Sequence, residues 1–294
     1  MYYHNNEINN PNIKRRTFIM KKLLAFCIMA AMALSFVGCS KPAAEPEAEP
    51  AENTAQETSD TLDYEEIVVG LDDTFAPMGF RDENGELTGL DVDLMEAVSD
   101  ELGIPFQLQP IDWSMKETEL NNKSIDLIWN GYTITPARQE VVLFSKPYLS
   151  NKQVVVTMAD SDIKTLADLA GKQVGAQAES SAVDAIDAKP EIKDTFGNFV
   201  TLETNDMCLR DMEAGRIDAV VADEVILRYY ISQKGAENYN ILEEDFGDEQ
   251  YGIGARKDDT ALIEAIDNAM ETLKENGKAA EISTKWFGSD IIGK

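Results

Sequence analysis

Arg138 and Asp223 are charged residues that each follow a segment able to hold them in place. Arg138 comes directly after the turn-like residues 135–137, and Asp223 follows the apolar run 217–222. A guanidinium group can bind a carboxylate through two parallel charge-assisted hydrogen bonds. A carboxylate can bind an ammonium group, and does so most strongly in a poorly hydrated cleft where charges are less screened. The alternatives are a surface salt bridge between Arg138 and Glu140 and an N-cap role for Asp223.

Short apolar runs and amphipathic stretches alternate around these two residues. The apolar runs predict strands at 67–71, 106–108, 125–129, 141–144, 154–156, 174–176, 199–202, 217–222 and 250–255. Helical spacing predicts helices at 91–102, 114–122, 181–188, 206–214, 224–233 and 260–275. Ser114, with Glu117 three residues on, has the spacing of a capping box.

The pattern of strands and helices begins again near residue 154. Strands that alternate with helices indicate parallel α/β sheets. We therefore expect an α/β chain of two lobes, each a mostly parallel sheet flanked by helices. Ligands of open α/β sheets bind outside the carboxyl ends of the strands, so the site is expected in the cleft between the lobes.

The N-terminal segment has the pattern of an export signal. Lys21 and Lys22 precede an apolar run at 23–37, which is short for a membrane-spanning helix. Residues 36–39, ending in Cys39, resemble a lipobox, in which the cysteine is acylated and becomes the new N-terminus. We therefore interpret 1–38 as a signal peptide and Cys39 as a lipidation site. The alternative is an ordinary signal with a chance cysteine.

Two further features of this segment bear on how the chain starts and is exported. Met20 is a more suitable start than Met1, and residues 15–18 loosely resemble a twin-arginine signal. Residues 39–64 are rich in Ala, Pro and Glu and cannot bury enough apolar surface to fold. They are predicted to form an extended acidic tether between the lipid and the lobes.

The composition of the chain excludes several classes of function. Its 294 residues include 26 basic and 54 acidic side chains, a formal charge of −28 that repels nucleic acid. The one histidine, His4, precedes the signal, so the mature chain offers no Ser/His or Cys/His pair for catalysis. Cys208 lies in a helical stretch and is interpreted as packing. We expect no catalytic residues, no metal and no cofactor.

Four stretches together resemble the polar-amino-acid family of ABC transporter solute-binding proteins. They are 70–80 (GLDDTFAPMGF) continued by 89–94, 113–148 with IDLIWNGYTITPARQEVVLFSKPY, 171–181 (GKQVGAQAESS) and 214–224 (AGRIDAVVADE). The sequences YGIG at 251–254 and KWFG at 285–288 resemble the end of the family pattern. The resemblance covers nearly all of residues 65–294.

The resemblance implies a type II periplasmic-binding-protein fold. Lobe 1 would comprise 65–151 and 250–294 and lobe 2 would comprise 152–249, with crossings near 148–153 and 248–251. The lobes would close around the ligand by a hinge motion. The implied function is a monomeric, lipid-anchored extracytoplasmic receptor, which binds a free L-amino acid and delivers it to the permease of an ABC importer in the membrane.

The resemblance also assigns roles to residues at the invariant ends of the ligand. Arg138 would hold the α-carboxylate, supported by the Thr133 amide and hydroxyl and by the amides of Ser180 and Ser181. Asp223 and the Gly131 carbonyl would hold the α-ammonium. The other residues assigned to the pocket are its aromatic walls and the loop that follows a strand, namely Phe75, Trp113, Asn130 and Tyr132. Simple core packing and helix capping are the alternatives for the aromatic residues and the serines.

The ligand's side chain would be selected by Asp72 and Gln177. An acid with an amide suits a polar side chain such as that of glutamine, asparagine or cystine. Glu179 replaces the glycine usual in the family. If it points inward the pocket favours lysine or arginine; if outward it is a solvated charge.

Two other classes of function stay open at this point. Some relatives with this fold are dehydratases that use a carboxylate as general acid, and an Asp or Glu here could do the same. A sensing domain of a signalling protein would require a transmembrane helix and an output domain after residue 294.

Overall fold

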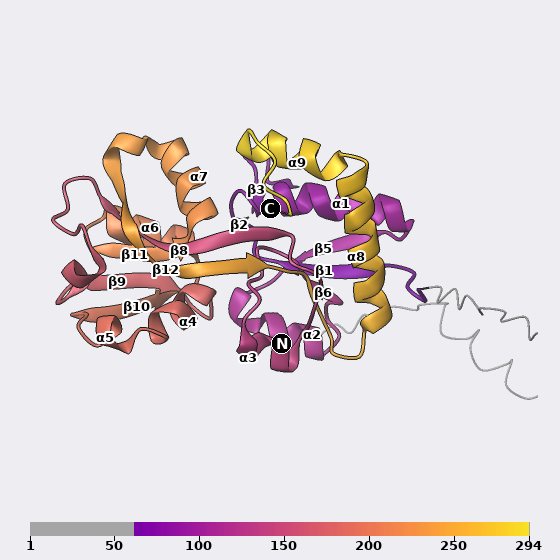
Figure 1. Ribbon diagram of the computed structural model, residues 1–294, viewed down its shortest axis with the longest axis horizontal. Helices are drawn as coiled ribbons and strands as arrows, with labels where there is room; N and C mark the ends of the chain where they lie inside the picture. The colour runs from indigo at the N-terminus through magenta and orange to yellow at the C-terminus, as the bar shows by residue number, and fades with distance from the viewer. Residues whose placement is uncertain (1–61, 294) are drawn as a thin grey trace, which may run out of the picture. The chain divides into compact units, whose positions relative to one another are not determined.

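The structure is a computed structural model that describes residues 62–293, which form two lobes, each built on a five-stranded sheet (Figure 1). The predicted signal peptide, Cys39 and nearly all of the predicted tether lie outside the described residues. Within 62–293 no helix has both the length and the apolar character needed to cross a membrane.

The lobe 1 sheet has the strand order β5-β1-β6-β13-β7. The strands are β5 (Phe106–Pro110), β1 (Ile67–Leu71), β6 (Leu127–Ile128), β13 (Gly254–Ala255) and β7 (Leu143–Phe144). β1 pairs in parallel with β5 and β6, and β13 is antiparallel to both β6 and β7. Four of the five strands therefore point the same way. A small sheet at the edge of this lobe comprises β2 (Thr74–Phe75), β3 (Gly79–Arg81) and β4 (Leu87–Thr88).

The lobe 2 sheet repeats this arrangement with the order β10-β9-β11-β8-β12. The strands are β10 (Asn198–Leu202), β9 (Gln173–Gln177), β11 (Ala219–Asp223), β8 (Leu149–Met158) and β12 (Tyr239–Tyr251). Only β8 runs against its neighbours. The predicted fold of two mostly parallel lobes is confirmed.

Two long strands connect the lobes. β8 and β12 pair from Met158 and Tyr239, deep in lobe 2, to Leu149 and Tyr251 at the lobe 1 end (Figure 1). At that end Tyr251 bridges to Thr133 and Leu149 to Ile292, both in lobe 1. The pairing shifts register between Ile241 and Gly247, and an antiparallel pair of this kind resists stretching but permits bending, which suits a hinge.

Helices cover both faces of each sheet. In lobe 1 they are α1 (Leu90–Leu102), α8 (Thr260–Glu275) and α9 (Lys278–Phe287) on one side, with η2 (Trp113–Met115), α2 (Lys116–Asn121) and α3 (Pro136–Val141) elsewhere in the lobe. In lobe 2 they are η3 (Leu166–Leu169), α4 (Ser181–Asp187), α5 (Pro190–Lys193), α6 (Asn205–Glu213), α7 (Glu224–Lys234) and η4 (Ala236–Asn238). α6 and α7 lie on one side of the lobe 2 sheet and α4 and α5 on the other (Figure 1).

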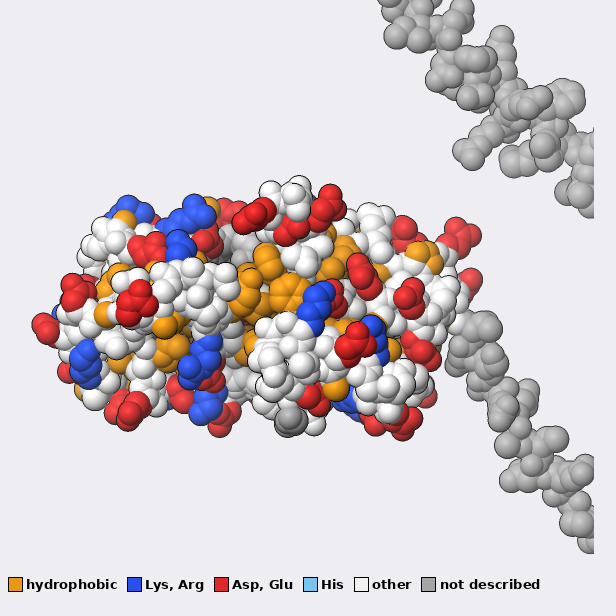
Figure 2. All heavy atoms as spheres, turned by 90° about the horizontal axis from the view of Figure 1, so that it is seen from above, with side chains coloured by type: hydrophobic (Ala, Val, Ile, Leu, Met, Phe, Trp, Pro, Cys, Tyr) orange, Lys and Arg blue, Asp and Glu red, His pale blue; other side chains and the backbone are white. Residues whose placement is uncertain are grey.

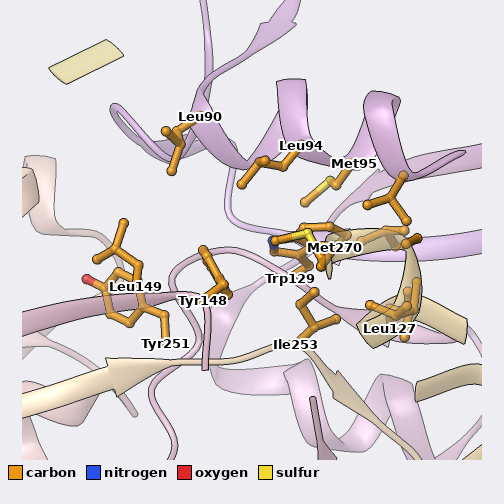
Figure 3. Packing of buried hydrophobic residues seen from close by; sticks show 14 of the residues in the cluster. Leu90, Leu94, Met95, Leu127, Trp129, Tyr148, Leu149, Tyr251, Ile253 and Met270 are labelled. Carbon is orange, nitrogen blue, oxygen red and sulfur yellow. The ribbon is translucent and has the colours of Figure 1, made fainter. Parts of the chain in front are cut away.

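The core of lobe 1 lies between α1, α8 and the sheet. The apolar residues of α1 recur at helical spacing, so Leu94 and Met95 share the face that points toward Trp129 and Met270 (Figure 3). These side chains are fully or almost fully buried. The packing fixes α1 on the sheet and thereby holds the loop that leaves β6. The outer surface is acidic, with Asp and Glu side chains spread over the face shown in Figure 2.

Among the predicted elements whose ends differ from the structure, three bear on the site. The expected strand 250–255 is divided, because Tyr251 ends β12 and the chain then crosses to β13 in the other sheet. Val141 ends α3 rather than beginning a strand. The expected cap at Ser114 is wrong: the side chain of Asp112 caps this segment by accepting from the Ser114 amide at 2.9 Å.

A buried carboxyl group ties α1 to the loop after β6. Asp91 accepts hydrogen bonds from the Gly131 amide at 2.8 Å and from the Tyr148 hydroxyl at 2.9 Å. Burial outweighs these hydrogen bonds and raises the pKa of Asp91 from 3.8 to about 7.

Asp91→Asn should flatten part of the pH dependence of stability. Between pH 3.8 and about 7 the unfolded chain loses this proton while the folded chain keeps it. The contribution of Asp91 to the free energy of unfolding therefore falls as the pH rises through this range. Urea unfolding at several pH values should show that the free energy of unfolding of the variant rises relative to that of the native chain between about pH 4 and about pH 7. Parallel curves for the two proteins would contradict the assignment.

Candidate functional site

A cavity between the lobes brings together residues from loops that are distant in the sequence. The space that it leaves open is only about 10 Å³, and it is lined by Asp72, Phe75, Trp113, Asn130, Gly131, Arg138, Gln177, Ser180, Ser181 and Asp223. Most of them follow or end strands β1, β6, β9 and β11, as expected for a site at the carboxyl ends of parallel strands. All of these lining residues were singled out from the sequence. A larger but open depression over the hinge strands contains neither Arg138 nor Asp223.

Arg138 reaches this cavity from the first turn of α3. The Thr135 side chain caps that helix by accepting from the Arg138 amide. The guanidinium is buried, with 7% of the residue exposed, and donates from Nη1 to the Thr133 carbonyl at 3.0 Å. Such a buried guanidinium is not engaged in the alternative surface salt bridge with Glu140. Nη2 also donates to the Glu179 carbonyl at 3.2 Å, so the N–H groups that neither carbonyl uses are the ones that could bind a carboxylate.

Tyr132 does not line the cavity, contrary to expectation. Its ring is fully buried beneath Arg138, with the guanidinium carbon 4.8 Å from the ring centre. The Tyr132 hydroxyl donates to Glu117 at 2.8 Å, and Glu117 also lies 4.0 Å from Nε of Arg138. Tyr132 therefore orients the arginine through a cation–π contact instead of forming the wall of the cavity.

Asp223 ends β11 at the opposite side of the cavity. It accepts a hydrogen bond from the Gln153 amide at 2.8 Å and another from the Tyr251 hydroxyl. Its side chain makes no capping hydrogen bond with α7, so the N-cap alternative does not describe its side chain. Burial, and after it the negative charge of Glu249, raise the pKa of Asp223 to about 8. Because these partners are neutral or acidic, an added cation would stabilise the carboxylate.

A chain of hydrogen bonds connects the arginine side of the cavity with the aspartate side. Thr133, whose carbonyl accepts from Arg138, donates from its hydroxyl to Ser181 at 3.0 Å. The Gln153 amide nitrogen lies 3.1 Å from the same Ser181 hydroxyl and 2.8 Å from Asp223. Thr133 thus lies behind the lining, and the Ser181 hydroxyl connects the lobes. Ser180, at the N-cap of α4, makes no capping hydrogen bond through its side chain.

Gln153 and Tyr251 are the site residues that sequence reasoning missed. Gln153 lies on β8 and Tyr251 ends β12, so both belong to the hinge strands. A glutamine directly before three valines, within the expected crossing at 148–153, was the available signal. A buried polar side chain within a strand requires a partner, and here that partner is Asp223.

The other end of the cavity is a network of an acid and amides. Oδ2 of Asp72 accepts from the Gln177 amide at 2.8 Å, and Oδ1 accepts from the Thr74 amide and hydroxyl. The Gln177 oxygen in turn accepts from Asn205 at 2.9 Å. The amide nitrogen of Asn130 is buried and has no hydrogen-bond partner. This end therefore offers an acceptor on Asp72, whereas the side-chain nitrogen of Asn130 lies close to Gly79.

Glycine is required at position 131 because of the turn and the aromatic wall. Gly131 has a φ of 56°, and a Cβ there would lie 2.7 Å from Cε1 of Phe75. Phe75 and Trp113 are each 7% exposed and both line the cavity, so neither is wholly part of the core. The absence of a side chain at 131 lets Phe75 pack against the backbone of the loop.

The Glu179 side chain is exposed, so of the two alternatives left open by the sequence the outward one holds. Its φ is 55°, in the left-handed region, where a glycine is the usual residue. Its backbone carbonyl, in contrast, accepts a hydrogen bond from Nη2 of Arg138 at 3.2 Å. The backbone of this residue, rather than its charge, therefore contributes to the site.

The fold and the site together define a two-lobed solute-binding protein. The family model of bacterial extracellular solute-binding proteins, family 3, matches residues 67–289, and the chain belongs to this family. The L-cystine-binding protein TcyJ of Escherichia coli (strain K12) is 29% identical over 227 residues, which are 76% of this chain and 84% of that protein.

Two solved structures show the same likeness. One is an ABC uptake transporter substrate-binding protein from Streptococcus pneumoniae with bound histidine, at 42% identity and a TM-score of 0.76, covering 78% of this chain and 95% of that one. The other is the arginine-, lysine-, histidine-binding protein ArtJ from Geobacillus stearothermophilus, at 30% identity and a TM-score of 0.70, covering 76% and 96%.

Proposed function

We propose that this chain is the extracytoplasmic receptor of an amino-acid ABC importer and binds a free L-amino acid between its lobes. The observation that carries the proposal is that Arg138 and Asp223 line one cavity from opposite lobes. A buried guanidinium and a buried carboxylate that lacks a cationic partner are complementary to the carboxylate and ammonium groups of a zwitterion. The names of the relatives, which describe binders of cystine, histidine and arginine, support the same class.

The two ends of the amino acid would be bound by different lobes. Arg138 in lobe 1 would hold the α-carboxylate, with Thr133 and the amides of Ser180 and Ser181 around it. Asp223 in lobe 2 would hold the α-ammonium together with the Gly131 carbonyl. The ligand would then connect the lobes and stabilise the closed state, because only that state offers both contacts.

The ligand's side chain would contact Asp72, Gln177 and Asn130 between the rings of Phe75 and Trp113. A side chain that donates a hydrogen bond, such as that of glutamine, asparagine or cystine, matches the acceptor on Asp72. A basic amino acid is the second candidate. Charge favours this candidate, because the lining contains two carboxyl groups, Asp72 and Asp223, and one guanidinium, Arg138. The ammonium of the amino acid would pair with Asp223, which leaves Asp72 for a second cation on the ligand's side chain.

Membrane attachment is proposed from the sequence. Acylated Cys39 would anchor the chain to the membrane after export, and the acidic tether at 39–64 would let the lobes reach the permease. The monomeric state is likewise a proposal.

Arg138→Ala should weaken amino-acid binding by at least about 2 kcal/mol, because the ligand carboxylate would lose its charged partner in a desolvated cleft. Isothermal titration calorimetry measures this loss. The matched control is Arg228→Ala on α7, whose side chain is mostly exposed and pairs with Glu224, and it should bind as the native chain does. Unchanged affinity in Arg138→Ala would refute the site assignment.

Asp72→Asn should separate the two ligand classes. A thermal-shift screen of the twenty amino acids, cystine and ornithine first identifies the ligand, because a bound ligand raises the melting temperature. For an amide or cystine ligand we expect a loss of about tenfold or less, since the introduced asparagine still accepts a hydrogen bond. A lysine or arginine ligand with a loss of about a hundredfold or more would establish the basic class instead.

Cys39→Ala should release the protein from the membrane. Without the thiol there is no acylation site, so the exported chain should move to the soluble extracytoplasmic fraction. Detergent phase partitioning of the native and variant proteins checks this. A variant that still partitions with lipid would show that the anchor lies elsewhere.

A further inference from the structure

Lys116 is a buried lysine that lies outside the lining of the cavity. It begins α2 in lobe 1 and is 2% exposed. Its Nζ lies 3.2 Å from the Trp113 carbonyl, 3.3 Å from Oε2 of Glu117 and 3.1 Å from the Glu179 carbonyl. The first two acceptors belong to lobe 1 and the third to lobe 2.

The arrangement matches the hydrogen-bonding capacity of an ammonium group. An ammonium has three N–H donors and no acceptor. Lobe 1 supplies partners for two of them, and the third is satisfied within the protein only when the Glu179 carbonyl is within reach. An unsatisfied N–H on a buried charge is costly, so burial of Lys116 is coupled to the approach of lobe 2.

Arg138 uses the same carbonyl. Nη2 of Arg138 donates to the Glu179 oxygen at 3.2 Å, so one backbone oxygen of lobe 2 accepts from two cations of lobe 1. Glu117 provides the compensating charge, since its carboxylate lies 3.3 Å from Lys116 and 4.0 Å from Arg138. The three side chains leave one net positive charge at the carboxylate end of the cavity.

The turn that carries this carbonyl also carries two residues of the cavity. Glu179 joins Gln177, at the end of β9, to Ser180 and Ser181 at the start of α4. Its left-handed backbone sets the direction of the carbonyl, whereas its side chain is exposed. Holding the carbonyl therefore holds Ser180 and Ser181 beside Arg138.

We propose that Lys116 is a positioning residue for ligand binding, which retains the closed state by docking on the Glu179 backbone carbonyl and so places the 177–181 turn against Arg138. This inference rests on the proposed function of the cavity. Lys116 does not touch the ligand. Its effect falls on release rather than on encounter, because the contact exists only after the lobes close.

Lys116→Met tests this directly, because it keeps the apolar stem of the side chain and removes the ammonium. With L-glutamine and L-arginine as probes, the variant should bind about tenfold more weakly, with a faster dissociation rate and an unchanged association rate in stopped-flow fluorescence. Lys116→Arg retains the donors and should restore most of the affinity. Lys164→Met, at an exposed lysine of lobe 2, should bind as the native chain does.

The role of the backbone carbonyl has its own control. Glu179→Ala removes the side chain and keeps the carbonyl, so it should lose much less affinity than Lys116→Met. If Glu179→Ala loses as much affinity as Lys116→Met, the partner of Lys116 is the glutamate side chain and the proposal is wrong. Failure of Lys116→Arg to recover affinity, with native stability in thermal unfolding, would also overturn it.

A second readout does not depend on the ligand. Glu101 in lobe 1 and Asp194 in lobe 2 are both exposed. Clickable noncanonical residues at these positions can carry a donor and an acceptor dye, so that fluorescence resonance energy transfer reports how close the lobes are. The ligand-free Lys116→Met protein should spend less time closed than the native chain. An equal closed fraction in the two proteins would refute the proposed role of Lys116. If neither probe nor any other amino acid binds the native chain, the proposed function fails, while this measurement still decides the role of Lys116.

Discussion

Burial of Asp223 between two lobes is the constraint on which the rest of the site depends. A carboxylate removed from water is unfavourable unless donors or a cation compensate it. Here the donors are Gln153 and Tyr251, one from each hinge strand, while Glu249 adds a repelling charge. The closed arrangement therefore positions a carboxyl group whose pKa is raised to about 8 by burial and, after it, by Glu249. A ligand ammonium would supply that cation, which links recognition of the ligand to the strands that must bend.

On the opposite side of the cavity the buried charge that requires compensation is a cation, the Arg138 guanidinium. Arg138 is compensated by Glu117, by the ring of Tyr132 and by two backbone carbonyls. Lys116 adds a second cation on this side and pairs with the same Glu117. The site therefore presents a cation in lobe 1 and, at Asp223, a carboxyl group that a ligand ammonium would stabilise as a carboxylate, so a molecule with both charges would be oriented by its two ends. In the proposed arrangement, Asp72 and Gln177 would contact the ligand's side chain alone.

Much of this arrangement could be predicted from the sequence, because it rests on local patterns. Apolar runs predicted β1 and β9, and Gly103 ended α1 as expected. The order of the motifs placed Arg138 and Asp223 at one site. Predictions failed where long-range packing decides: Tyr132 turned beneath Arg138, and the segment 250–255 divided between two sheets. Gln153, Tyr251 and Lys116 gained their roles only from partners distant in the sequence.

Calorimetric titration with the amino acid that gives the largest thermal shift, and with its N-acetyl and α-amide derivatives, tests the paired-end site most directly. If Arg138 and Asp223 hold the two ends, the free amino acid binds and each derivative loses at least about tenfold in affinity, because each removes one charged contact. An N-acetyl derivative that binds as tightly as the free amino acid would contradict the role of Asp223, and an equally tight α-amide would contradict that of Arg138.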